Sequence, residues 1–394
     1  MASGRPLLHT HREVGRPDFE RVALVLQGGG ALGSYQAGVF EALEEAAIDV
    51  DWIAGVSIGA INAALIAGAE KSRRVANLRA FWNDVSQSFA CNPLMKALPS
   101  DLLEAEDVRV ALNHMSAATA LFGGVNAMYA PRVLPAWMMP RGSAGATSFY
   151  DGAPLRNALT KYVDFDRINA KELRFSVGAV NIRTGNLAYF DTTSTVILPE
   201  HIMASAALPP TFPPVDIDGE SYWDGGLVSN TPLDWVTEGE PRLDTLVFQV
   251  DLWNTRGQRP ADLGEVATRQ KEIQYASRTR ASTDAFRRVQ RLRNTVHELL
   301  ATLPEEIRSG AIAQKVAREI ERKVFRIVHL IYHAKPHQWS TKDFEFSALN
   351  IREHWLTGYR DATRSLRHPE ALARPDLDVA EGVATFDVAV NGRV

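Results

Sequence analysis

Apolar residues in the first 70 positions alternate between short continuous runs and helical spacing. Residues 22–26 (VALVL) form one run, and residues 52–54 (WIA) form a second. Between the two runs, Phe40, Leu43 and Ala47 recur every three or four positions, which indicates a helix. Short continuous runs are typical of strands that are buried on both faces of a parallel sheet. The pattern therefore predicts two neighbouring strands joined by a helix.

The same alternation continues through much of the chain. Residues 60–68 are small and apolar and predict a helix that packs closely on a sheet, while residues 173–180 and 187–190 predict a β-hairpin. Further strands are expected at residues 245–250 and 324–332, and further helices at residues 286–303, 312–320 and 354–367. This order of elements predicts an α/β protein with a three-layer α/β/α core.

The chain is expected to have three parts. They are a loose N-terminal tail at residues 1–20, the core at residues 21–252, and a basic, mainly helical C-terminal extension at residues 253–394. Residues 255–372 hold 22 Lys and Arg against 14 Asp and Glu, a net charge of +8, although the whole chain carries −4. A net charge this small gives no reason to expect a nucleic-acid partner.

The extension contains an apolar stripe that begins at Phe286 and is flanked by arginines. These are Arg278, Arg280, Arg287, Arg288, Arg291 and Arg293. A basic amphipathic helix of this kind is typical of proteins that lie on anionic membranes, and it predicts peripheral membrane contact. The alternative is that the apolar stripe docks on the core and the arginines form a solvated face. The sequence does not predict the oligomeric state.

The sequence also bears on the compartment. Cys91 is the only cysteine, which fits a reducing environment. Residues 1–20 lack the apolar centre of a secretory signal, and no uninterrupted apolar run reaches the roughly 18 residues that a membrane-spanning helix needs. We therefore expect a cytoplasmic protein that contacts membranes peripherally.

A proline-interrupted apolar run at residues 131–140 (PRVLPAWMMP) stands outside the pattern of strands and helices. It could form an apolar lid over a binding site, or a wall that contacts an acyl chain. It could equally be ordinary core that lies beneath a loop.

Two glycine motifs follow the first two predicted strands. Residues 28–33 (GGGALG) stand between a strand and a helix, where backbone N–H groups can converge on an anion. A dinucleotide site would need an acidic residue at the end of the second strand. Asp49 and Asp51 instead precede that strand, so this interpretation is disfavoured. Residues 55–59 (GVSIG) have the pattern of a nucleophile elbow, which exposes the hydroxyl of Ser57 on a sharp turn.

A third motif, residues 224–226 (DGG), comes much later in the chain. By itself it is a simple Asp-Gly turn. Beside the two glycine motifs, Asp224 becomes the candidate general base, because a serine hydroxyl is a poor nucleophile without one. Aspartate at its reference pKa of about 3.9 is a weak base, so we expect burial to raise the pKa of Asp224 and to place it within hydrogen-bonding reach of Ser57.

Together these motifs resemble the patatin-like lipid acyl hydrolases over about residues 21–252. Residues 204–215 (ASAALPPTFPPV) and 230–232 (NTP) match the same family in the same order. In the family, a Ser–Asp dyad works without histidine, which implies Ser57 as nucleophile and Asp224 as base. The same resemblance implies Gly28, Gly29 and Gly30 as oxyanion-hole donors, with Gly33, Gly55, Gly59, Gly225 and Gly226 as supporting glycines of the motifs.

The resemblance also bears on substrate and cofactors. It implies hydrolysis of carboxylic esters in acyl lipids, with phospholipids as the expected class, through an acyl-enzyme intermediate. Leu32 occupies a place where the family often has Arg or Lys. No cofactor is expected, and no metal either, because no His, Cys and Asp cluster has the spacing of metal ligands.

Two other functions compete with this one. An esterase with a Ser–His–Asp triad would need a late histidine, for which the candidates are His297, His329, His333, His337 and His354. A lipid-binding protein without activity would have no reason to keep both Ser57 and Asp224.

Overall fold

The computed structural model describes residues 7–86, 105–320, 322–335, 338, 341–376 and 383–388. The strands are β1 (Arg21–Leu26), β2 (Trp52–Gly55), β3 (Ala130–Pro131), β4 (Tyr150–Asp151), β5 (Arg174–Asn181), β6 (Leu187–Asp191), β7 (Val215–Ile217), β8 (Glu220–Asp224), β9 (Thr245–Asp251), β10 (Phe325–Ile331) and β11 (Val383–Asp387). The helices are α1 (Gly33–Glu45), α2 (Ile58–Ala67), α3 (Arg74–Ser86), α6 (Glu106–Gly123), α7 (Ala153–Tyr162), α8 (Phe165–Asn169), α9 (Pro199–Ser205), α10 (Leu233–Glu238), α11 (Leu263–Thr302), α12 (Glu305–Arg308), α13 (Ala311–Glu319) and α14 (Ala348–Leu366). Cys91 lies outside the described residues.

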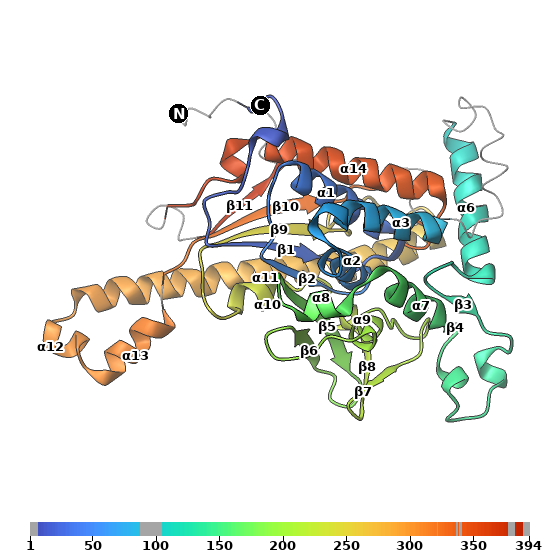
Figure 1. Cartoon of the computed structure of the whole chain (residues 1–394), viewed down its shortest axis with the longest axis horizontal. Helices are drawn as coiled ribbons and strands as arrows, with labels where there is room; N and C mark the ends of the chain where they lie inside the picture. Colours follow the sequence, from blue (N-terminus) through green and yellow to red (C-terminus); the bar gives the residue numbers. More distant parts are fainter. Residues whose placement is uncertain are drawn as a thin grey trace.

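The described residues build a nine-stranded sheet in the order β11-β10-β9-β1-β2-β5-β8-β7, with β6 also paired to β5 (Figure 1). Neighbours from β11 to β5 are parallel, whereas β6, β7 and β8 pair antiparallel. The predicted neighbours β1 and β2 pair directly, with Ala23 opposite Trp52. The predicted hairpin is β5 and β6. The prediction of an α/β fold is therefore confirmed.

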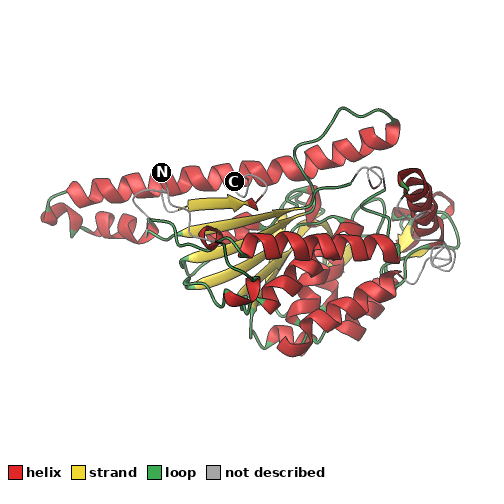
Figure 2. Cartoon of the chain, turned by 90° about the horizontal axis from the view of Figure 1, so that it is seen from above, coloured by secondary structure: helices red, strands yellow, loops and turns green. Residues whose placement is uncertain are grey.

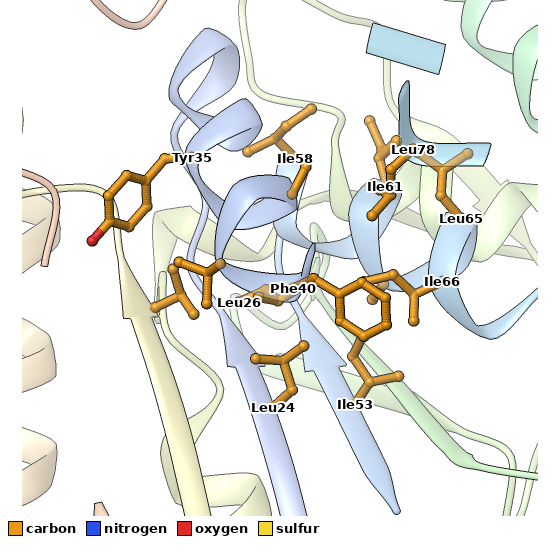
Figure 3. Close-up of a cluster of buried hydrophobic side chains, with 14 of the residues drawn as sticks. Leu24, Leu26, Tyr35, Phe40, Ile53, Ile58, Ile61, Leu65, Ile66 and Leu78 are labelled. Carbon is orange, nitrogen blue, oxygen red and sulfur yellow. The ribbon is translucent and has the colours of Figure 1, made fainter. Parts of the chain in front are cut away.

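Helices cover both faces of the sheet, as Figure 2 shows. Side chains of β1 point alternately to the two faces, as the period of a strand requires. Leu24 and Leu26 pack with Phe40 and other residues of α1 and α2 in the larger core cluster (Figure 3). Val25 packs on the opposite face in a smaller cluster that includes Phe286 of α11. These clusters are the two interfaces of a three-layer fold.

The C-terminal extension completes this fold. β10 pairs with β9 and β11, so the sheet continues beyond residue 252. α14 lies across α1, where the Tyr35 hydroxyl donates to Asp361 Oδ2 at 3.0 Å. The extension is otherwise helical, as expected, and the strand predicted at residues 324–332 is β10. β11 was not predicted from the sequence.

The tail that was expected to be loose makes specific contacts from residue 7 onward. The Leu8 N–H donates to the Arg367 carbonyl at 2.9 Å. His11 is buried, and its Nε2 lies 3.0 Å from Glu45 Oε2 on α1. Residues 8–12 thus lie against α1 and the end of α14, while Arg16 bonds Asp51 before β2 and Glu20 bonds the Asp244 N–H.

α11 is longer than the sequence pattern indicated. It runs for 40 residues, and the Asp262 side chain caps its start by accepting from the Glu265 N–H. Phe286 is buried against Phe325, with ring centroids 4.9 Å apart, so at this point the apolar stripe docks on the sheet. The side chains of Arg278 and Arg280 lie outside the described residues. Within the described part of the chain we find no helix with both the length and the apolar character of a membrane span.

Candidate active site

Ser57 stands on the tight turn between β2 and α2. Its backbone has φ 57° and ψ −126°, a left-handed conformation that is unfavourable for a residue with a side chain. Such strain persists only where the surroundings impose it, and it is common at catalytic residues. The Ser57 N–H donates to the Ser205 hydroxyl at 3.0 Å, and that hydroxyl donates to the Gly178 carbonyl at 2.7 Å. Ser205 thus holds the turn in place.

The two glycines of the elbow are required by close backbone contacts. A Cβ at Gly55 would lie 2.3 Å from the Gly59 carbonyl oxygen, and one at Gly59 would lie 2.2 Å from the Leu26 carbonyl oxygen. The start of α2 therefore sits directly against the end of β1. This places Ser57 next to the glycine loop that follows β1.

Asp224 reaches Ser57 because β8 takes the place of β2 beyond its end. β5 pairs with β2 through residues 174–177 and with β8 through residues 179–181. Along β5, the pairing with β8 therefore starts just after the pairing with β2 stops. Since β8 runs antiparallel, its last residue, Asp224, pairs with Ala179 just past Gly55. This arrangement brings Ser57 and Asp224 together although they are 167 positions apart in the sequence.

The Asp224 carboxyl is fully buried. Burial raises its pKa to about 7, against the opposing effects of hydrogen bonds from the Ser57 side chain and the Gly226 N–H. The Gly226 N–H donates to Asp224 Oδ1 at 2.7 Å. A carboxylate with a pKa near neutrality is a far better base than a solvated one. The structure therefore brings the predicted serine and aspartate together with the predicted electrostatics.

The glycine loop is held on both sides of Gly28. The Gly28 N–H donates to the Asn230 carbonyl at 3.1 Å. The Gly28 carbonyl accepts from Asn230 Nδ2 at 2.9 Å and from the indole Nε1–H of Trp253 at 2.8 Å. Gly28 was expected to be an oxyanion donor, but its N–H is already hydrogen-bonded to the Asn230 carbonyl. Sequence motifs show which glycines are present but not which N–H groups are used.

Gly29 and Gly30 differ from Gly28. Their N–H groups donate to no acceptor among the described residues, and both residues line the pocket beside Ser57. Gly30 has φ +57°, which suits glycine, and a Cβ there would lie 2.1 Å from the Asp343 carbonyl oxygen. The same carbonyl accepts from the Ala31 N–H at 2.9 Å. The loop thus presents two N–H groups and is fixed from behind by the extension.

A pocket of about 410 Å³ opens above the dyad. Ser57, Asp224 and the glycine loop lie on its floor. Its walls are largely apolar and include Ile58, Ile61, Leu155, Met203, Phe212 and Phe346. Lys271 is the only lysine or arginine among the described residues that line it. The size and character of this pocket suit an apolar chain attached to a polar group.

The extension contributes part of this pocket, a role that the sequence did not reveal. Its lining residues are Trp253, Lys271, Tyr275, Asp343, Phe344 and Phe346. Lys271 Nζ pairs with Asp343 Oδ2 at 2.5 Å, and the buried Lys342 ammonium pairs with Glu272 at 2.5 Å. These ion pairs connect α11 to the segment that supports the glycine loop. No local pattern could have identified them, because the partners are about 70 positions apart and more than 200 from Gly30.

The candidate histidines lie elsewhere. No histidine lines the pocket among the residues that the structure describes. His354 is buried beside Tyr332, His329 Nδ1 lies 3.9 Å from Asp251 Oδ2, and His297 and His333 are exposed. His337 lies outside the described residues. The geometry therefore favours a dyad over a Ser–His–Asp triad.

The proline-interrupted run at residues 131–140 matches neither expectation for it. It contains a short 3₁₀ turn, Ala136–Met138, and it is not among the residues that line the pocket. Val133 is 98% exposed and Trp137 is 78% exposed, so the run is not buried core either.

Replacing Trp253 with phenylalanine should lower kcat about 10- to 100-fold, with little change in KM. The variant keeps the aromatic ring but loses the N–H bond to the Gly28 carbonyl, and a small shift of the neighbouring Gly29 and Gly30 N–H groups weakens oxyanion stabilisation. Steady-state kinetics on a soluble ester would measure this. Trp355→Phe is the matched control, since its indole N–H donates to Glu41 away from the pocket. Equal kcat values for the two variants would contradict the positioning role of Trp253.

Comparison with known proteins agrees with these features. Residues 24–236 match the family model described as patatin-like phospholipase, and residues 273–378 match a second model described as patatin phospholipase. The chain is 23% identical over 268 residues to lysophospholipase NTE1 of Yarrowia lipolytica, covering 66% of this chain and 15% of that protein. It is 56% identical over 57 residues to lysophospholipase nte1 of Aspergillus terreus, covering 14% of this chain and 4% of that protein.

Two other similarities complete the comparison. The chain is 44% identical over 61 residues to patatin-like phospholipase domain-containing protein 6 of Mus musculus, covering 16% of this chain and 4% of that protein. The crystal structure of VipD from Legionella pneumophila aligns at 13% identity with a TM-score of 0.37, covering 94% of this chain and 72% of that one. The chain spans 15% or less of the length of these three sequence relatives. Because one family model matches more than half of its residues, the chain belongs to the patatin-like phospholipase family, a family of carboxylic ester hydrolases.

Proposed function

We propose that this protein is a serine acyl hydrolase that cleaves carboxylic esters of acyl lipids, with Ser57 as the nucleophile and Asp224 as the base. One observation carries the proposal. A buried carboxyl whose pKa is raised to about 7 hydrogen-bonds a strained serine at the floor of an apolar pocket. Strain and a perturbed pKa at the same point both cost free energy of folding, and such costs are concentrated at functional sites.

The first half of the reaction forms an acyl-enzyme. Asp224 takes the proton from the Ser57 hydroxyl as the oxygen adds to the ester carbonyl carbon. The negative charge that develops on the carbonyl oxygen is stabilised by the N–H groups of Gly29 and Gly30. When the intermediate collapses, the carbon–oxygen bond to the alcohol breaks, and Asp224 returns its proton to the departing alkoxide. The alcohol is released and the acyl group remains on Ser57.

The second half of the reaction repeats these steps with water. Asp224 removes a proton from water as its oxygen adds to the acyl carbonyl carbon, and the same two N–H groups stabilise the oxyanion. Collapse then breaks the bond to Ser57 Oγ, which recovers the proton from Asp224. The fatty acid leaves and the enzyme is regenerated without a cofactor.

Phospholipids and lysophospholipids are the proposed substrates. The apolar pocket suits an acyl chain, and the Lys271–Asp343 ion pair at its lining offers a polar point of contact for a headgroup. The sequence relatives carry lysophospholipase in their names, which agrees with this choice. Since such lipids are insoluble, the proposal includes peripheral contact with a membrane, and it places the protein in the cytoplasm.

A serine-directed fluorophosphonate tests the proposal directly. We expect a single covalent adduct on Ser57, found by mass spectrometry of the digested protein, and release of fatty acid from a phospholipid. The probe requires an activated serine, so labelling reports the dyad even for a poor substrate. An adduct on another serine would contradict the assignment of Ser57, and no adduct at all would favour a lipid-binding protein without activity.

A further inference from the structure

A group of large apolar side chains is exposed beside the pocket. We call it the apolar rim and define it as Leu121 and Phe122 of α6 together with Val133, Trp137, Met138 and Phe149. Their exposed fractions range from 43% to 98%. Single exposed apolar residues are common on protein surfaces, but clusters of large ones mark sites of interaction.

Several contacts bring Leu121, Val133 and Phe149 of the apolar rim close together, and Trp137 and Met138 follow Val133 within five positions of the chain. The Tyr150 hydroxyl donates to the Leu121 carbonyl at 2.6 Å, which brings the end of α6 next to Phe149. The Arg132 guanidinium donates to the Ser148 hydroxyl at 2.8 Å, which brings Val133 to the same place. β3 and β4 pair between these points, and Figure 1 shows them together with α6 at one end of the molecule.

The apolar rim is continuous with the pocket. Leu121 and Phe149 both line the pocket, yet they are 43% and 50% exposed. An apolar chain that enters the pocket could therefore stay in contact with side chains of the rim. A rim that only covered the core would not share side chains with the inside of the pocket.

The charge of this region supports the same partner. Residues 110–150 contain no Asp, Glu or Lys, and only Arg132 and Arg141 carry a full charge, whereas 23% of the whole chain is charged. A surface without carboxylates pays no cost for removing water from an anion when it meets a lipid surface, and it does not repel an anionic leaflet. Exposed Trp and Met side chains are well suited to the boundary between headgroups and acyl chains.

We propose that the apolar rim docks this protein on a lipid bilayer, with Trp137, Met138 and Phe122 entering the acyl region and the pocket mouth facing the membrane. This inference rests on the proposed function for its choice of partner. A lipid could then leave the bilayer through the rim and enter the pocket without passing through water.

Arg287 of α11 is poorly placed for that task. Lys271 lines the pocket, whereas Arg287 lies 16 residues farther along the helix, about 24 Å away at 1.5 Å per residue. The Arg287 guanidinium also donates to the Thr385 hydroxyl at 2.6 Å, beside the buried Phe286. A membrane held by this part of α11 would not face the pocket mouth.

The test measures binding apart from hydrolysis. In the Ser57→Ala background, co-sedimentation with phosphatidylcholine vesicles is compared for the parent and for Phe122→Ser/Trp137→Ser/Met138→Ser. These three side chains do not line the pocket. We expect binding to weaken at least about 30-fold, because three large apolar groups lose their contact with the acyl region. The same three substitutions are also made in the active protein, which keeps Ser57. Its rate of hydrolysis of a soluble short-chain ester should stay within about twofold of the parental rate, which also shows that the variant is folded.

The matched control is Leu299→Ser/Ile307→Ser/Ile312→Ser, which removes three exposed apolar side chains at the far end of α11 and in α12 and α13. This variant should bind like the parent. Equal binding by the rim variant, or an equal loss in the control, would overturn the proposal. Binding that requires anionic vesicles and is lost on raising salt from about 0.05 to 0.5 M would instead assign docking to the arginines. If no ester is hydrolysed but the rim variant loses binding, the proposed function fails while the docking surface stands.

Discussion

Replacing Ser57 with alanine should lower ester hydrolysis at least about 10⁴-fold and abolish labelling by a fluorophosphonate. The loss is this large because no other nucleophile replaces the serine, and only binding and oxyanion stabilisation remain. The fold should not change, since the Ser57 N–H bond to Ser205 uses the backbone and is kept in the variant. Release of fatty acid, the extent of labelling and the melting temperature would together measure this.

A matched control separates this effect from a general loss of hydroxyl groups. Ser221→Ala, on β8, removes a hydroxyl that bonds Asp216 at the surface, and it should keep parental activity. If Ser57→Ala retained more than about 1% of the parental rate, the nucleophile would have to be another residue.

Replacing Asp224 with asparagine should lower the rate about 10²- to 10⁴-fold, the usual contribution of a general base. Asparagine has nearly the same shape and can still accept from the Gly226 N–H, but it cannot take a proton. In the parent enzyme, only the ionised carboxylate is active. Because burial raises the pKa of Asp224 to about 7, the rate should rise with pH through about 7 and then level off. The residual rate of the variant should lack this rise.

The same substitution should raise stability at alkaline pH. A carboxyl whose pKa is near 7 in the folded protein and near 3.8 when unfolded binds its proton more tightly when folded. The parent therefore loses stability as the pH rises from about 4 to about 7, in total about 4 kcal/mol at 1.36 kcal/mol per pKa unit. In urea unfolding, the free energy of unfolding of Asp224→Asn should exceed that of the parent by more at pH 8 than at pH 5. A gain that does not depend on pH would mean that Asp224 is not buried as an anion.

The two effects of Asp224→Asn belong together. A group that costs the folded protein several kcal/mol at neutral pH is retained only where its charge is used. A variant that is both more stable and inactive would therefore support a catalytic role, whereas a structural aspartate would lose stability when it is changed.

Much of the core could be predicted because its signals are local. The continuous apolar run at residues 22–26 requires burial on both faces, and both clusters of the core receive side chains from β1. The elbow at Ser57 is largely local, since Gly55 is needed by the turn itself, whereas Gly59 is needed by the close approach of β1. β11 was missed because it is a short strand near the C-terminus, where its five residues give no clear period.

The catalytic site could be predicted only in part from the sequence. The motifs indicated Ser57, Asp224 and the glycine loop. The number of free N–H groups in that loop depends on Asn230, because its carbonyl accepts a hydrogen bond from the Gly28 N–H. Trp253 and Asp343 hold the loop from positions more than 220 residues away. No sequence spacing encodes such contacts, because they arise only when β9 and the extension pack beside β1.

The sequence by itself determined the alternation of strands and helices, the strained serine turn and the presence of an aspartate that could serve as its base. Each depends on interactions within a few residues, whose physical requirements are visible in the order of the amino acids. The tertiary structure decided the pKa of Asp224, the pair of N–H groups that face the pocket, and the extension's share in its walls. It also decided that residues 131–140 lie exposed beside the pocket and not inside it. These properties depend on burial and on contacts between distant segments, which exist only once the chain has folded.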